Sequence, residues 1–342
     1  MKLRGNSLVS IITPSYNHEK FIAYCINSVL KQSYEHWEQI IIDDGSTDGT
    51  GEIVRGVCDP RVRYVYQPNE GIEALAHTYN RGLEMARGTL IAILEGDDAW
   101  PSGKLSAQID DFDDPEVVLS FGEAQDIDTN GHQASASSRT SRLRRKLPKT
   151  VLFNNPVGSA TFRLLSVEGL SFIPPATAMI RKSTLQAIGG FQYEPGLCLT
   201  DIPTFIRLSI EGKFHYSEEV RGFRRRHLNS ASLRHLQTMS VKVREYVFKL
   251  IDRPDFALSE IQRDKIRTSW MLKSASPEFT AGRLCLLERR WAEARQHFSS
   301  SIQSHHPHLM AATIAGWALS WFHCDIEGLF RLAGRAPLKS GD

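Results

Sequence analysis

Two runs of apolar residues in this chain each end in a cluster of acidic residues, and this pattern constrains the fold most. Residues 40–42 precede Asp43 and Asp44, and residues 90–94 precede a segment that contains Asp97 and Asp98. Short apolar runs bounded by turn residues are typical of buried strands. In open α/β sheets, ligands bind beyond the carboxyl ends of the strands. The two acidic clusters are therefore expected to face one crevice.

The first hundred residues alternate between strand-like and helix-like patterns. Strands are expected at residues 8–13, 37–42, 61–66 and 90–94, and helices at residues 19–32, 50–58 and 72–86. Such alternation predicts a parallel sheet covered by helices on both faces. The expected fold class is therefore α/β, a mostly parallel sheet flanked by helices. Residues 1–98 would form its nucleotide-binding half.

The pattern changes twice further along the chain. Residues 99–230 alternate less regularly, with a strand expected at 117–121 and helices at 183–188 and 200–212. After about residue 235, long helical patterns dominate, and residues 279–303 are typical of a helical hairpin. These changes predict a domain over residues 1–230, with an acceptor-binding half at 99–230, and a helical C-terminal subdomain over 231–342.

Charge and cysteine content narrow the partners and the compartment. The net charge of +2 gives no reason to expect nucleic acid binding. Two basic clusters read either as solvated surface or as patches for an anionic acceptor or membrane: Arg139, Arg142, Arg144, Arg145, Lys146 and Lys149, and Arg221, Arg224, Arg225 and Arg226. The five scattered cysteines and an N-terminus without signal-peptide features favour the cytoplasm. The apolar residues 309–322 are too few to span a bilayer, so they predict burial or, alternatively, contact with the inner membrane face.

The acidic pairs have a chemical interpretation. Carboxylates at the mouth of a strand, such as those of Asp43 and Asp44, can accept hydrogen bonds from a uracil N–H or ribose hydroxyls. Asp97 and Asp98 offer the hard oxygen ligands that Mg²⁺ or Mn²⁺ prefers when it also binds phosphate. The simpler alternative for both pairs is a tight turn whose acids cap the next helix.

Several segments together resemble the inverting family 2 glycosyltransferases of the GT-A fold, in the order of that family. The resemblance rests on residues 9–17, 28–34, 41–50, 80–83, 86–88, 95–101 and 104–105, and it covers about two-thirds of the chain. It implies a nucleotide-sugar donor, with residues 41–50 as the nucleoside-binding turn and residues 95–101 as the metal-binding segment.

The resemblance also implies roles for residues outside the acidic pairs. Thr13, Pro14 and Tyr16 would form the opposite wall of the nucleotide site, and Arg226 would reach the diphosphate. Asp97 would bind the metal, although Glu95 stands where the family usually has aspartate. Asp201 would be the general base that deprotonates the acceptor hydroxyl. Its partner in the family's acidic pair is replaced here by Thr200.

The sequence argues against other nucleotide-binding classes. No GxGxxG follows the first expected strand, so a nicotinamide dehydrogenase is not indicated. Two alternatives stay open: a nucleotidyltransferase and a catalytically silent sugar-nucleotide-binding partner module. We expect a metal-dependent inverting glycosyltransferase that uses a nucleotide-sugar, UDP-linked, and a saccharide or lipid-linked acceptor in cell-surface polysaccharide biosynthesis.

Overall fold

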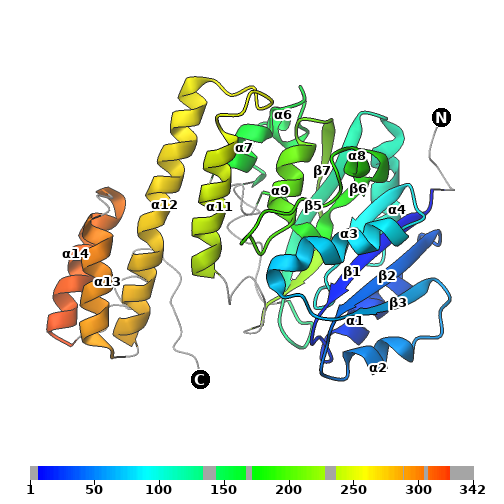
Figure 1. Cartoon of the computed structure of the whole chain (residues 1–342), viewed down its shortest axis with the longest axis horizontal. Coiled ribbons are helices and arrows are strands. Elements are labelled where there is room, and N and C mark those ends of the chain that lie inside the picture. Colours follow the sequence, from blue (N-terminus) through cyan, green and yellow to red (C-terminus); the bar gives the residue numbers. More distant parts are fainter. Residues whose placement is uncertain are drawn as a thin grey trace. The chain divides into compact units, whose positions relative to one another are not determined.

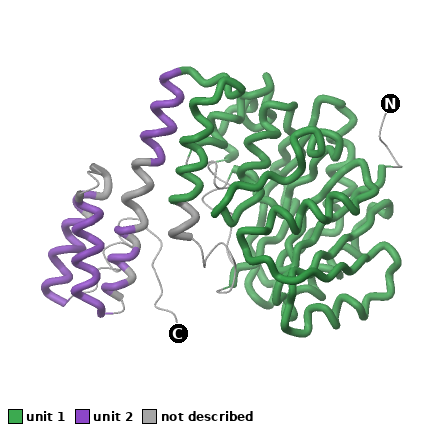
Figure 2. Tube along the Cα trace, viewed as in Figure 1, with its two compact units in different colours: residues 1–259 green, residues 260–342 purple. Residues whose placement is uncertain are grey.

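The computed structural model describes residues 7–133, 144–166, 172–227, 236–287, 289–303 and 307–323 of the chain. It contains two compact units, residues 1–259 and 260–342, which are coloured separately in Figure 2. The predicted domain boundary between residues 230 and 231 lies outside the described residues and stays a prediction.

A seven-stranded sheet forms the centre of the first unit (Figure 1), in the order β3-β2-β1-β4-β6-β5-β7. Strands β3, β2, β1 and β4 pair in parallel, β6 runs against both of its neighbours, and β5 and β7 are parallel to each other. The predicted mostly parallel α/β fold is thus confirmed. The strands are β1 (Val9–Ser15), β2 (Trp37–Asp44), β3 (Val62–Gln67), β4 (Leu90–Ile93), β5 (Val117–Ile127), β6 (Met179–Arg181) and β7 (Lys213–Arg225).

Helices cover both faces of this sheet because their apolar residues recur at helical spacing. On one face, Ile22, Cys25, Ile26 and Val29 of α1 pack into the same core as β1 and β4. On the other face, α3 approaches β1 closely, and a β-carbon at Gly82 would lie 2.6 Å from Ile12. The helices of this unit are α1 (Ile22–Leu30), α2 (Thr50–Arg55), α3 (Leu75–Met85), α4 (Lys104–Ile109), α6 (Lys149–Leu152), α7 (Thr161–Leu165), α8 (Lys182–Ala187), α9 (Asp201–Leu208) and α11 (Leu236–Leu250).

Several elements differ in length from their predictions, and two of these differences involve strand β7. Strand β5 continues from the expected end at Phe121 to Ile127, because β7 pairs with it along its polar second half. Helix α9 ends at Leu208 rather than continuing to residue 212, and β7 begins at Lys213. Both differences reflect pairing between segments that are far apart in the sequence.

The second unit consists of helices α12 (Glu260–Leu287), α13 (Trp291–Gln303) and α14 (Pro307–Trp321). The ring of Phe298 in α13 is fully buried, and β-carbons at Gly282 in α12 and Gly316 in α14 would lie 2.8 and 2.5 Å from it. Glycine at these positions lets the helices approach one aromatic ring. The predicted C-terminal helices are therefore present. Over the described part of the chain, every helix falls short of the length and apolarity needed to cross a membrane.

Candidate active site

The two acidic clusters lie on either side of the end of β1. Strand β1 pairs with β2 so that Ser15 lies opposite Asp43. On the other side of β1, the backbone N–H of Gly96 donates to the carbonyl of Pro14 at 3.0 Å. A β-carbon at Gly96 would lie 2.7 Å from Nδ1 of His18, so only glycine permits this close approach. Both acidic clusters thus follow strands that pair in parallel with β1, at the same end of the sheet, and their binding of one ligand stays a prediction.

Glu95, Asp97 and Asp98 form a compact carboxylate cluster after β4. Each side chain offers one oxygen, and these oxygens all lie within 4.8 Å of one another. Burial and the charges of Asp97 and Glu95 raise the pKa of Asp98 well above its ordinary value. Burial, Asp97 and Asp201 raise the pKa of Glu95 to about 8. Ionising all three carboxyl groups of the cluster together is therefore unfavourable without a nearby positive charge.

Two histidines lower the cost of ionising Asp97. Burial alone would raise the pKa of Asp97, but His18 and His227 outweigh it, and the pKa lies below the ordinary value. The Nε2 atom of His227 lies 2.9 Å from Oδ2 of Asp97, and both side chains are largely buried. Asp97 is thus the member of the cluster that is most readily ionised.

The end of β7 holds the loop after β4 in place. Ala99 and Phe223 exchange backbone hydrogen bonds of 3.0 and 2.7 Å. The backbone N–H of Arg225 donates to Oδ1 of Asp98 at 2.8 Å, and its guanidinium donates to the carbonyl of Asp97 at 2.8 Å. Sequence reasoning noted the basic run at 224–226 but gave no bracing role to Arg225, which is 3% exposed. In the sequence, Arg225 is only one arginine in a basic run at the end of a strand, and this pattern alone does not indicate that it holds another loop in place.

The neighbouring arginines of the run face another acid. Arg224 and Arg226 both form ion pairs with Asp126 of β5, at 2.7 and 3.0 Å. The predicted contact of Arg226 with the diphosphate stays a prediction, and the side chain is 45% exposed beside the cluster's bracing strand.

The nucleoside side of the site is built from β2 and β3. Tyr64 donates its hydroxyl to Oδ2 of Asp43 at 2.6 Å, and the backbone N–H of Ser46 donates to Oδ1 at 2.8 Å. Burial and Asp43 raise the pKa of Tyr64 to about 12. Gln67 donates to Asp44 at 2.6 Å. Tyr64 and Gln67 were not singled out from the sequence, although both lie on the alternating strand β3.

The predicted wall at the end of β1 is divided between buried and exposed residues. Thr13 is fully buried, and its hydroxyl accepts a hydrogen bond from Gln39 at 3.0 Å. Pro14 is also buried, whereas Tyr16, directly after β1, is 45% exposed. Asn17 follows in a left-handed conformation and bonds to the turn after β2 through Ser46. The roles of Thr13, Pro14 and Tyr16 in nucleotide binding stay predictions.

Asp201 begins helix α9 near the carboxylate cluster. Burial raises its pKa to about 6. Its charge contributes to the raised pKa values of both Glu95 and Tyr79, after the larger effect of burial. A carboxyl group with this pKa is mostly ionised at neutral pH and can still accept a proton, as a general base must.

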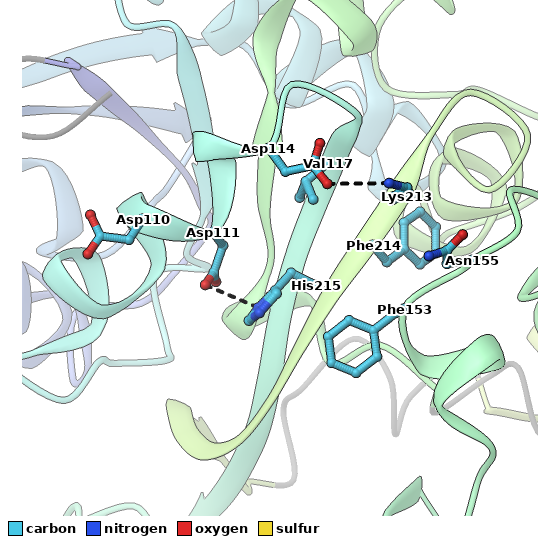
Figure 3. A pocket seen from close by; sticks show the side chains of 9 residues that line it. All are labelled: Asp110, Asp111, Asp114, Val117, Phe153, Asn155, Lys213, Phe214 and His215. Carbon is cyan, nitrogen blue, oxygen red and sulfur yellow. Dashed lines mark hydrogen bonds and ion pairs between the residues drawn. The ribbon is translucent and has the colours of Figure 1, made fainter. Parts of the chain in front are cut away.

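A cavity of about 360 Å³ lies elsewhere, at the beginnings of β5 and β7 (Figure 3). Two of its acids have basic neighbours: Asp111 lies 3.1 Å from Nδ1 of His215, and Asp114 lies 3.4 Å from Nζ of Lys213. It belongs to the opposite end of these strands from Arg225, and none of its lining residues comes from the carboxylate cluster.

Comparisons with known proteins agree with this arrangement. The chain is 42% identical over 116 residues to a Bacillus subtilis protein named as the teichuronic acid biosynthesis glycosyltransferase TuaG, covering 33% of this chain and 45% of that protein. It is 39% identical over 123 residues to the Escherichia coli protein named UDP-Glc:alpha-D-GlcNAc-diphosphoundecaprenol beta-1,3-glucosyltransferase WfgD, covering 36% and 48%. The chain thus spans about half the length of the curated relatives it matches.

Solved structures share the fold. The S. aureus TarS fragment 1–349 in complex with UDP-GlcNAc superposes with a TM-score of 0.58 at 16% identity, covering 95% of this chain and 92% of that one. The Pyrobaculum calidifontis mannosyltransferase PcManGT in complex with GDP-Man and Mn²⁺ gives 0.54 at 17% identity, covering 94% and 82%. The profile of the family described as glycosyl transferase family 2 matches residues 10–188, more than half of the chain. With its strand-end carboxylates and its GT-A-like sheet, this chain therefore belongs to glycosyl transferase family 2.

Proposed function

We propose that this chain is an inverting glycosyltransferase that moves a sugar from a UDP-linked donor to a saccharide or lipid-linked acceptor in cell-surface polysaccharide biosynthesis. The observation that carries the proposal is the carboxylate cluster of Glu95, Asp97 and Asp98 after β4, and the acid Asp201 at the start of α9 supports it. A transferase of this class needs both groups, one for the leaving diphosphate and one for the incoming hydroxyl.

The donor and acceptor classes follow from what related proteins bind or are named for. The TarS structure contains UDP-GlcNAc, and the name of WfgD specifies UDP-glucose and a diphosphoundecaprenol acceptor. In this chain, Asp43 and Asp44 end strand β2, which neighbours β1, and their carboxylates would accept hydrogen bonds from a uracil N–H or ribose hydroxyls. These features support a UDP-sugar as donor.

The donor set of the cluster fits a divalent cation, Mg²⁺ or Mn²⁺. Asp97 and Asp98 would hold the ion. The Nε2 atom of His227 lies 2.9 Å from Oδ2 of Asp97 and would orient this carboxylate. Burial, together with the charges of Asp97 and Glu95, raises the pKa of Asp98, and a bound cation would favour its ionised form. When bound, such an ion supplies stabilisation of the charge that grows on the departing diphosphate.

Asp201 would be the general base in this reaction. In an inverting displacement, the acceptor hydroxyl attacks the anomeric carbon from the side opposite the nucleotide, and a carboxylate removes its proton. The pKa of about 6 gives Asp201 the ionised form needed at neutral pH.

We also propose a cytoplasmic location with peripheral contact at the inner face of the membrane, through helix α14. Trp317, Trp321 and Ile314 are 36%, 59% and 48% exposed on this helix, at spacings that place them on neighbouring turns. Arg295 lies over the Trp321 ring at 4.3 Å and adds positive charge beside it. Exposed tryptophan next to arginine suits the interface of an anionic bilayer.

The test is product analysis with purified chain, Mn²⁺ and a panel of UDP- and GDP-sugars, with and without a lipid-diphosphate acceptor. Release of free UDP that depends on the acceptor, with inverted configuration at the transferred sugar, is the expected result. Formation or consumption of pyrophosphate would instead indicate a nucleotidyltransferase. Donor binding without any release would indicate a silent binding module.

A further inference from the structure

Tyr79 of helix α3 contacts the carboxylate cluster through Glu95. Its hydroxyl donates to Oε1 of Glu95 at 3.2 Å. The side chain is 2% exposed, and its ring packs on Phe191 with ring centroids 4.8 Å apart. Tyr79 is thus a rigid, buried donor aimed at one member of the cluster.

Glu95 is the member of the carboxylate cluster that Tyr79 contacts. Its carboxyl group is within 4.8 Å of side-chain oxygens of Asp97 and Asp98. A displaced Glu95 would therefore disturb the arrangement of these two carboxylates.

A glutamate at this position needs an external restraint. Glutamate has one more rotatable bond than aspartate, and its side-chain freedom must be lost if the carboxyl group is to stay in one place. The Tyr79 hydroxyl supplies that restraint through the bond to Oε1.

Helix α3 also connects to the segment that leads into α9. The Asn80 side chain donates to the carbonyl of Phe191 at 2.8 Å and accepts from its backbone N–H at 2.7 Å. One residue later, the backbone N–H of Gln192 donates to Thr204 of α9 at 3.0 Å. Two neighbouring residues of α3 thus have different contacts. Tyr79 bonds to the carboxylate cluster, and Asn80 bonds to the segment that precedes α9, the helix that begins with Asp201.

We propose that Tyr79 is a positioning residue of the transferase site, whose hydroxyl fixes the Glu95 carboxyl group beside the carboxylates of Asp97 and Asp98. The proposal rests on the proposed function and adds to it a residue that does not touch substrate. Tyr79 acts only through Glu95, and this makes the two residues energetically coupled.

The experiment is a double-mutant cycle of Tyr79→Phe and Glu95→Asp in the full chain. Tyr79→Phe removes only the hydroxyl and keeps the ring on Phe191. We expect it to lower kcat and the Mn²⁺-dependent affinity for UDP by about tenfold each, as is common for residues that orient metal-site carboxylates. In the Glu95→Asp background, the shortened side chain cannot reach position 79, so Tyr79→Phe should change either quantity by less than about twofold.

The matched control is Tyr216→Phe. Tyr216 is another buried tyrosine that donates to a glutamate, Glu123, at 2.5 Å, but neither residue belongs to the site. This variant should keep wild-type kcat and UDP affinity, and thermal unfolding of both variants measures any general loss of stability.

The outcomes separate this inference from the proposed function. Wild-type kinetics and UDP affinity for Tyr79→Phe, or effects that multiply with those of Glu95→Asp, would overturn the positioning role. If the wild-type chain binds Mn²⁺ and UDP but transfers no sugar, the proposed function fails, and the titrations still decide the role of Tyr79. Absence of Mn²⁺-dependent UDP binding by the wild-type chain would overturn both.

Discussion

His227 lies 2.9 Å from Asp97, although 130 positions separate the two residues in the chain. The contact joins the end of β7 to the loop after β4, and it lowers the pKa of Asp97 together with His18. It makes Asp97 the strongest candidate among the acids for binding a divalent cation.

Replacing Asp97 with alanine should abolish sugar transfer and the enhancement of UDP binding by Mn²⁺. The reason is the loss of the most readily ionised oxygen ligand of the cluster. Isothermal titration with UDP, with and without Mn²⁺, measures the second effect. The control is Asp59→Asn, because Asp59 pairs with Arg61 away from the cluster. Full activity of Asp97→Ala would refute the metal assignment.

Asp201→Asn should lower kcat by about 10²–10⁴-fold, the usual contribution of a general base, and leave UDP binding almost unchanged. The amide keeps the size of the carboxylate but cannot take the acceptor proton. Single-turnover measurements with saturating donor separate chemistry from binding. A parallel loss of donor affinity would mean that Asp201 serves the nucleotide rather than the acceptor.

The rate of transfer should depend on pH through the same carboxylate. Because the general base must be ionised and the pKa of Asp201 is about 6, kcat at saturating donor and Mn²⁺ should rise with pH and reach half its plateau near pH 6. An unperturbed aspartate would place this midpoint near pH 4. A profile that stays flat from pH 5 to pH 8 would contradict the assignment of the base.

The membrane proposal predicts that the chain sediments with vesicles containing phosphatidylglycerol and much less with vesicles of phosphatidylcholine alone. The double variant Trp317→Ser/Trp321→Ser should lose most of this binding, since it removes the exposed aromatic surface of α14. Ile261→Ser provides the comparison, because Ile261 is a 69% exposed apolar residue outside α14. Equal loss in both variants, or no vesicle binding by the wild type, would count against this role for α14.

Phe298→Ala should destabilise the second unit by about 3–5 kcal/mol, the usual cost of removing a buried phenylalanine ring. The ring is fully buried between Gly282 and Gly316, so a cavity would remain at the contact of the helices. Hydrogen exchange in α13 and α14 reports the loss locally. Ile314→Ala, on the exposed side of α14, should change the exchange little.

The sequence predicted the half of the site that is built from local patterns. Asp43, Asp44, Asp97 and Asp98 each follow an apolar run, and the parallel sheet brings such positions together without any further information. Family resemblance was needed for Asp201, since an acid in the first turn of a helix is otherwise ordinary.

The other half depends on pairings that no local pattern contains. Arg225 and His227 reach the loop after β4 only because β7 pairs with β5 and ends beside residues 97–99. Likewise, Arg144 belongs to a run that suggested a charged surface, yet its guanidinium is buried against Glu123. Arg139 and Arg142 of that run lie outside the described residues. Charge runs in sequence do not distinguish a solvated side chain from one that enters the interior.

The bracing of the loop after β4 by Arg225 has a consequence for redesign. Because the backbone of Arg225 bonds to Asp98 and its side chain to the carbonyl of Asp97, the last residues of β7 cannot be exchanged freely to obtain a new acceptor preference. The same guanidinium also donates to the backbone carbonyls of Asp128 and Thr129, directly after β5. Libraries that vary this chain should therefore hold both residues 223–227 and residues 128–129 constant, because changes at either end would loosen the loop after β4.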